Sequence, residues 1–188
     1  MARPREFDAD AALDSAIEVF RDHGFEGTSA QMLVDAMRIG RQSLYDSFGD
    51  KWQLYRAAVR RYGEAERAAH LDALRRGPRA IDGIEAMLRR VVDAASQPCL
   101  GTSSICEFGT SRQDLTEQRM PLAHALRTAI SARVREAQTE GDVTPDLDPG
   151  AITDFLLANF TGIRLASRGG AGPAALTSLA DMTLRALR

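Results

Sequence analysis

Hydrophobic positions recur with helical spacing along nearly the whole chain. In the N-terminal segment, apolar residues fall on one face of a helix, and acidic residues recur every four positions on another face. The sequence lacks the long alternating runs of Val, Ile and Thr that would indicate strands. The pattern therefore predicts an all-α protein of about nine helices. The apolar stripe consists of Leu13, Ala16, Ile17 and Phe20, and the acidic stripe of Asp10, Asp14, Glu18 and Asp22.

Glycine and proline divide the chain into its predicted helices. Gly24 is a candidate end for the first helix, and Gly77 is followed by a proline that closes a long one. Pro121 lies inside a predicted helix and is expected to kink it or to mark its true start. Beyond residue 49, we expect helices at about residues 50–76, 78–96, 101–111, 114–140, 151–167 and 173–187.

Residues 27–51, GTSAQMLVDAMRIGRQSLYDSFGDK, predict two short helices joined by a tight turn. The hydroxyl of Thr28 or Ser29 caps the first helix, and the second spans roughly residues 41–48. The second helix buries Leu44 and Phe48, four residues apart, and leaves polar side chains on its outer faces. A pair of this kind lets the second helix lie in the DNA major groove while the first crosses the backbone.

The exposed side chains of the second helix suit the recognition of bases and phosphates. Arg41 can make two hydrogen bonds to guanine, Gln42 can pair with adenine, and Ser43 can serve either a base or a phosphate. Tyr45 and Lys51 suit phosphates, since Lys51 adds its charge to the positive end of the next helix. The candidate DNA-binding residues are Thr28, Ser29, Gln31, Arg41, Gln42, Ser43, Tyr45 and Lys51.

The segment SLYDSFGDKWQLY resembles the recognition helix and following segment of the TetR family of repressors. The family pattern is a Leu-Tyr pair, then an aromatic residue three positions before a lysine, and then a long helix. Leu44, Tyr45, Phe48 and Lys51 match it. The resemblance covers the first quarter of the chain, and beyond it the all-helical layout agrees.

The resemblance implies two domains. A helix-turn-helix DNA-binding domain is expected at residues 1–50, and a ligand-binding and dimerisation domain at residues 51–188. Two residues depart from the family pattern: Arg38 stands where a turn glycine is usual, and Gly40 where a serine cap is usual. A left-handed Arg38 would cost free energy, and Gly40 is a weaker cap than serine.

The last two helices are candidates for a dimer interface. In the resembled family these helices form a four-helix interface, and a dimer allows a major-groove reader to span two half-sites. The segment DPGAITDFLLANFTGIRLAS is apolar on more than one face, which is typical of a helix that meets another chain. The alternative is an ordinary core helix. The expected interface residues are Phe155, Leu156, Ile163, Leu176, Leu179 and Met182.

A ligand pocket is expected between the long helix and the dimer helices, because the resemblance implies a ligand-controlled repressor. Pockets between bundle helices are mostly apolar, so the expected effector is a small apolar or amphipathic molecule. The same residue types at helical spacing also form plain core. The candidate lining residues are Met87, Val91, Cys106, Phe108, Met120, Leu126, Ile130 and Phe160.

The net charge of −2 gives nucleic-acid binding no support from bulk composition. The acidic stripe of the first helix can, however, face away from DNA. Arg3 and Arg5 precede that helix beside a proline, and such a basic arm can touch the DNA backbone or enter the minor groove. A frayed terminus is the alternative.

Other classes of function find little support in the sequence. No P-loop, GxSxG, HExxH or Rossmann glycine pattern indicates an enzyme, and no Cys/His spacing indicates a metal site or cofactor. Cys99 and Cys106 are too far apart on one helix for a disulfide, although Cys106 remains an alternative redox or electrophile sensor. The chain has no run of membrane-spanning length and no apolar leader, so we expect a cytoplasmic protein without a membrane partner.

The sequence thus predicts a DNA-binding transcriptional regulator. As a homodimer it would bind a palindromic operator in double-stranded DNA, and a small-molecule effector would release it. A helix-turn-helix module that binds a protein partner and no DNA is the remaining alternative.

Overall fold

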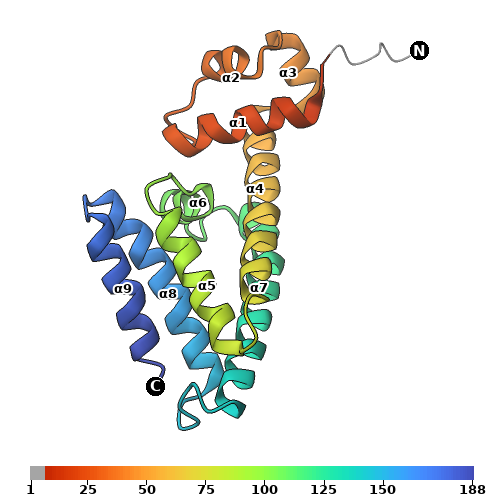
Figure 1. Cartoon of the computed structure of the whole chain (residues 1–188). Helices are drawn as coiled ribbons and strands as arrows, with labels where there is room; N and C mark the ends of the chain where they lie inside the picture. Colours follow the sequence, from red (N-terminus) through yellow and green to blue (C-terminus); the bar gives the residue numbers. More distant parts are fainter. Residues whose placement is uncertain (1–6) are drawn as a thin grey trace. The chain divides into compact units, whose positions relative to one another are not determined.

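The computed structural model describes residues 7–188, and in that range it is all-helical, as predicted (Figure 1). The expected basic arm at Arg3 and Arg5 lies outside the described residues. Nine helices follow one another within the described range. They are α1 (Ala9–His23), α2 (Ala30–Met37), α3 (Arg41–Phe48), α4 (Lys51–Leu74), α5 (Ala80–Asp93), α6 (Leu100–Phe108), α7 (Gln113–Thr139), α8 (Pro149–Arg168) and α9 (Pro173–Arg185).

The chain divides into two compact units. The first unit comprises residues up to 64 together with residues 98–119, and the second comprises residues 65–97 and 120–188. Both α4 and α7 continue from one unit into the other. The functional boundary expected at residue 50 stays a prediction.

The first unit is built on the apolar stripe of α1. Ala16 and Phe20 of that stripe are completely buried, and the Phe20 ring meets Tyr55 of α4 edge to face at 5.0 Å between centroids. Leu33 of α2 and Leu44 of α3 are buried in the same cluster. The short helices α2 and α3 are therefore held by packing against α1 and α4, because eight residues alone form only a marginal helix.

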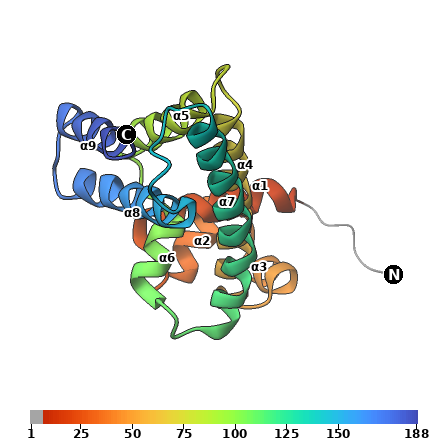
Figure 2. The ribbon, with the colours of Figure 1, turned by 90° about the horizontal axis from the view of Figure 1, so that it is seen from below.

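The second unit contains a bundle in which α5, α8 and α9 lie side by side (Figures 1 and 2). Its core includes Ile84, Met87 and Leu88 of α5 and Leu156 of α8, all fully buried. Gly83 allows α5 to approach the end of α4 closely, since a Cβ atom at this position would lie 2.2 Å from the carbonyl oxygen of Leu74.

The structure defines where α7 and α6 begin. α7 begins at Gln113 and continues through Pro121, so this proline does not mark the start of the helix. α6 begins at Leu100, and the Cys99 sulfur accepts a hydrogen bond from the backbone N–H of Thr102 at 3.5 Å.

None of the helices described is both long and apolar enough to cross a membrane.

Candidate nucleic-acid interface

The turn between α2 and α3 uses an arginine where glycine would be the least strained residue. Arg38 has φ 54° and ψ 40°, in the left-handed region, and its backbone N–H donates to the carbonyl of Val34. A non-glycine residue in this region costs about 1 kcal/mol or more. Ile39 is 8% exposed and fills the space between the helices, whereas Gly40 caps α3 without a side-chain hydrogen bond.

The second helix of the pair, α3, presents polar side chains outward. Leu44 is 1% exposed and anchors the helix on the core. Arg41 and Gln42 are exposed, Ser43 is half-buried, and Tyr45 is 39% exposed. The helix thus offers a guanidinium, an amide and a phenol to solvent, the groups that read base edges and bind phosphates.

Two of the candidate DNA-binding residues each donate a hydrogen bond to an aspartate one turn further along their own helix. The Gln42 amide donates to Asp46 at 2.8 Å, and the Gln31 amide of α2 donates to Asp35 at 2.8 Å. These bonds orient the amides before any partner arrives. They also place carboxylates on the outer face, so a DNA contact by Gln42 has to replace its bond to Asp46.

The remaining candidates at the edges of the helix pair occupy different environments. Ser29 caps α2, since its hydroxyl accepts from the Met32 N–H at 3.2 Å, and it is exposed. Thr28 is 1% exposed, and its hydroxyl donates to the Gly24 carbonyl at 2.6 Å. Thr28 therefore fixes the turn before α2, and its side chain has almost no exposed surface with which to contact DNA. The Lys51 ammonium lies 4.3 Å from the Phe25 ring centroid.

The acidic stripe of α1 is partly neutralised by arginines of α4 and of α1 itself. The Arg61 guanidinium donates to Asp14 at 2.6 Å and to Asp10 at 2.9 Å, and Glu18 pairs with Arg21 at 2.7 Å. These pairs reduce the negative charge that the stripe brings to the first unit. The low net charge of the chain is thus compatible with an anionic partner at α3.

A contact that sequence patterns did not indicate joins α6 to the turn after α1. The two carboxylate oxygens of Glu107 accept hydrogen bonds from the backbone N–H groups of Phe25, at 3.0 Å, and Glu26, at 2.9 Å. Gly24, at φ 69°, lets the turn pass close to this carboxylate. Arg21 strengthens the same connection by donating to the carbonyl of Pro98 at 2.9 Å.

A second link, within the first unit, involves Trp52 of α4. The Trp52 indole N–H donates to Asp114 at 2.7 Å, and the Arg112 guanidinium lies over its ring at 3.7 Å. The indole hydrogen bond and the charges of Arg56 and Arg112 hold the pKa of Asp114 below its usual value. The start of α7 is therefore fixed to the helix that follows α3.

The candidate ligand residues fall in both units. Met87, Val91 and Ile130 are fully buried in the core of the second unit, and Phe160 is 7% exposed there. Cys106 and Phe108 belong to the first unit, in which Cys106 is exposed and the Phe108 ring packs against Phe25, Trp52 and Tyr55. Leu126 packs partly buried against the second core, and Met120 is 62% exposed. Their assignment to one pocket stays a prediction.

The candidate dimer residues divide by exposure. Phe155, Leu179 and Met182 are 41%, 40% and 58% exposed, so they leave apolar surface of α8 and α9 open to a second chain. Leu156, Ile163 and Leu176 are buried in the core of their own subunit and so have little surface to offer a second chain.

Two short helices joined by a tight turn, with exposed polar side chains on the second, are the arrangement of a helix-turn-helix DNA-binding protein. Comparisons with known proteins agree. The family model described as bacterial regulatory proteins, tetR family, matches residues 12–58. The chain is 32% identical to the uncharacterized HTH-type transcriptional regulator YezE of Bacillus subtilis, covering 83% of this chain and 84% of that protein. The chain belongs to the TetR family of transcriptional regulators.

Two further similar proteins match nearly the whole length of this chain. The HTH-type transcriptional repressor ComR of Escherichia coli is 28% identical, covering 97% of this chain and 90% of that protein. Among solved structures, a cysteine mutant of the TetR family transcriptional regulator CifR, complexed with 26-bp double-strand operator DNA, superposes with a TM-score of 0.81. It is 29% identical and covers 99% of this chain and 100% of that chain.

Proposed function

We propose that this regulator is a repressor that binds a palindromic operator as a homodimer and is released by a small molecule in its C-terminal region. The observation that carries the proposal is the outward face of α3, where Arg41, Gln42 and Tyr45 are exposed while Leu44 anchors the helix. A similar regulator complexed with operator DNA, and a relative named as a repressor, support it.

Each α3 would enter a major groove, with Arg41, Gln42 and Ser43 at base edges and Tyr45 and Lys51 at phosphates. Ser29 and Gln31 of α2 would lie near the backbone, because the first helix of such a pair crosses it. Residues 1–50 would act as the reading domain, and residues 51–188 would bind the effector and the second copy.

The dimer would be formed through α8 and α9. We assign the contact to the exposed Phe155, Leu179 and Met182, and we assign their buried neighbours Leu156, Ile163 and Leu176 to the subunit core. Dimerisation would cover apolar surface that otherwise faces water.

Effector release would follow from linkage. The ligand would bind more tightly to a dimer conformation that does not fit DNA than to the conformation that does. The binding free energy for the operator then falls by the difference between the ligand's two binding free energies, typically about 1–3 kcal/mol. Operator DNA must then weaken ligand binding by the same factor.

A titration of DNA from upstream of the gene tests the proposal. We expect salt-sensitive binding to a palindrome, because phosphate contacts release counterions. Binding to no DNA at any salt concentration would favour the protein-interaction module instead.

A thiol sensor is a second candidate, favoured by the position of Cys106. Cys106 is exposed on α6, directly before Glu107, whose carboxylate holds the turn after α1. Modification of this thiol by an electrophile would disturb that connection. We expect Cys106→Ser to abolish electrophile-induced release from DNA in a fluorescence anisotropy assay, while Cys99→Ser, which keeps a cap on α6, retains it. Equal release of both variants would exclude this role.

A further inference from the structure

The second unit contains a buried group of charged side chains from three helices. Glu66 of α4 accepts hydrogen bonds from Arg90 of α5, at 2.5 Å, and from Arg164 of α8, at 3.0 Å. Arg164 is 7% exposed, and the side chain of Glu66 is 25% exposed. We call Glu66, His70, Arg90 and Arg164 the charged cluster.

The charged cluster carries more positive than negative charge. Burial by itself would raise the pKa of Glu66, but the hydrogen bond from Arg90 and the charges of both arginines hold it below the usual value, so this carboxylate is ionised. Burial and the nearby Arg90 lower the pKa of His70 to about 4, so the imidazole is neutral at pH 7. Two guanidinium groups therefore share one carboxylate, which leaves one unit of positive charge in the cluster.

His70 adds a buried donor to the cluster. Its Nε2 atom lies 3.3 Å from Nη1 of Arg90, and because a guanidinium only donates, Nε2 accepts this bond. The ring proton is then on Nδ1, which is buried without a hydrogen-bond partner among the described residues. The side chain is 9% exposed, and its ring stacks on Phe160 at 5.5 Å between centroids. A buried N–H group of this kind is rare unless an acceptor is supplied.

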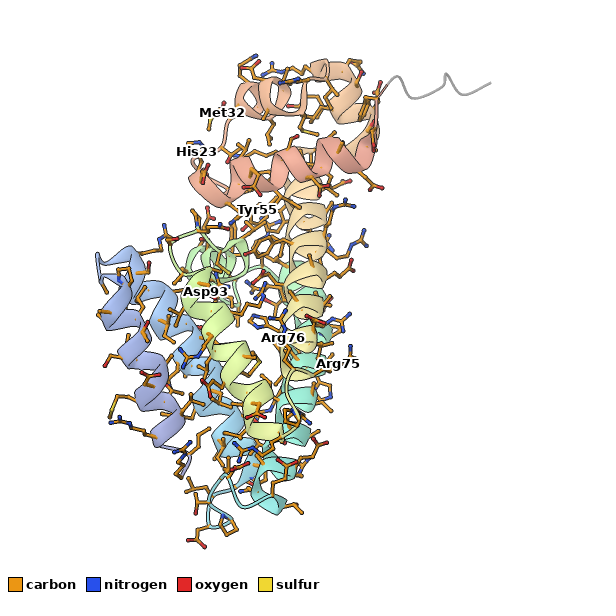
Figure 3. All side chains as sticks on the ribbon, in the orientation of Figure 1. His23, Met32, Tyr55, Arg75, Arg76 and Asp93 are labelled. Carbon is orange, nitrogen blue, oxygen red and sulfur yellow. The ribbon has the colours of Figure 1, made fainter. Side chains whose placement is uncertain are left out.

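Arg90 connects the charged cluster to solvent. Its side chain is 24% exposed and lies in the wall of a cleft of about 520 Å³. Arg76, Arg89 and Asp93 line the same cleft, so its ionised groups are mainly positive; Arg76 and Asp93 are labelled in Figure 3. A small anion entering the cleft would pass the more exposed Arg76 and Arg89 before it reached Arg90, the member of the charged cluster in the cleft wall.

We propose that the charged cluster is the binding site for the carboxylate of a small organic acid, with Arg164 pairing with one oxygen and His70 donating from Nδ1 to the other. Arg90 keeps its bonds to Glu66 and to Nε2 of His70. One carboxylate would match the single surplus positive charge, whereas a dianionic phosphate would leave negative charge in a buried setting. The apolar part of the acid would pack beside Phe160. This inference rests on the proposed ligand-responsive function and names the chemistry of the effector.

Benzoate and its neutral counterpart benzamide test the charge requirement on the full chain. We expect isothermal titration to show binding of benzoate, with benzamide at least tenfold weaker, because the amide lacks the charge that Arg164 pairs with. Equal affinity for the two compounds, or no binding of benzoate by the wild-type protein, would overturn the proposal.

Two variants locate the site. His70→Phe keeps a ring against Phe160 but removes the Nδ1–H donor. Arg164→Lys keeps the positive charge but loses the planar guanidinium group that can donate two parallel hydrogen bonds. Each is expected to weaken benzoate binding about tenfold, whereas Arg135→Gln, at an exposed position on α7, leaves it unchanged. Unfolding curves identify any variant that fails to fold. If folded His70→Phe binds benzoate as tightly as wild type, the charged cluster only stabilises the fold.

Operator binding without benzoate separates this inference from the function on which it rests. If the wild-type protein binds operator DNA but benzoate does not change this binding, only the carboxylate site is refuted. If the wild-type protein shows no sequence-specific DNA binding even without benzoate, the regulatory function itself is refuted.

Discussion

Single residues on α3 have distinct expected roles because their positions differ. Arg41 and Gln42 are exposed in the first turn of the helix, where side chains reach base edges, whereas Tyr45 lies one turn later and Lys51 begins α4. Gln42 is already oriented by Asp46. Base reading and phosphate binding can therefore be separated by substitution.

We expect Gln42→Ala and Arg41→Ala to relax base preference, each costing about 1–3 kcal/mol on the specific site and little on random DNA. Tyr45→Phe and Lys51→Ala should weaken binding to all sequences alike. Competitive anisotropy titrations with specific and random duplexes measure both effects. If all four variants change specific and random binding by equal factors, these roles are assigned incorrectly.

The strained turn residue Arg38 gives a prediction about stability. Glycine adopts φ 54° without steric cost, so Arg38→Gly should raise the free energy of unfolding by up to about 1 kcal/mol in the absence of DNA. Ala36→Gly, at an exposed position in the last turn of α2, should lower it by up to about 1 kcal/mol. Urea denaturation compares the two variants, and a loss of stability in both would contradict the strain at Arg38.

Among the elements, α6 acts through contacts with residues far away in the sequence. Glu107 holds two backbone N–H groups of the turn after α1, although more than eighty residues separate them in sequence. No local pattern could indicate this pairing, because a carboxylate on an exposed helix face is ordinary in sequence. The apolar stripe of α1 and the caps of α2 and α8, in contrast, depend on neighbouring residues and could be predicted.

Weakening the hydrogen bonds from Phe25 and Glu26 to Glu107 should make the turn after α1 open more often. Glu107→Gln replaces a charged acceptor by a neutral amide with one oxygen, so hydrogen exchange at the amides of Phe25 and Glu26 should accelerate about tenfold. Glu26→Gln, an exposed change in the same turn, serves as the control. Unchanged exchange in Glu107→Gln would show that the turn is held by packing alone.

At the scale of the whole molecule, the sequence predicted the class of fold and the position of the helix-turn-helix, because both follow from helical periodicity and local turns. It did not resolve which apolar residues of α8 and α9 face outward, since both helices carry apolar side chains on several faces. The charged cluster was also missed, because Glu66, Arg90 and Arg164 come together only through packing of three helices.

The exposed residues of α8 and α9 predict how the dimer can be broken. Met182→Asp should shift the protein from dimer to monomer at micromolar concentration, because a charge would be buried in an apolar interface. Ala132→Asp, on an exposed face of α7, should leave the dimer intact. Analytical ultracentrifugation distinguishes these states, and a wild-type protein that is monomeric throughout would refute the interface.

A hydroxyl-radical footprint on DNA from upstream of the gene most directly tests the claim that α3 reads an operator as part of a dimer. We expect two protected half-sites about one helical turn, or 10 base pairs, apart, both lost together in Gln42→Ala. A footprint confined to one half-site, or one that Gln42→Ala leaves unchanged, would contradict the account.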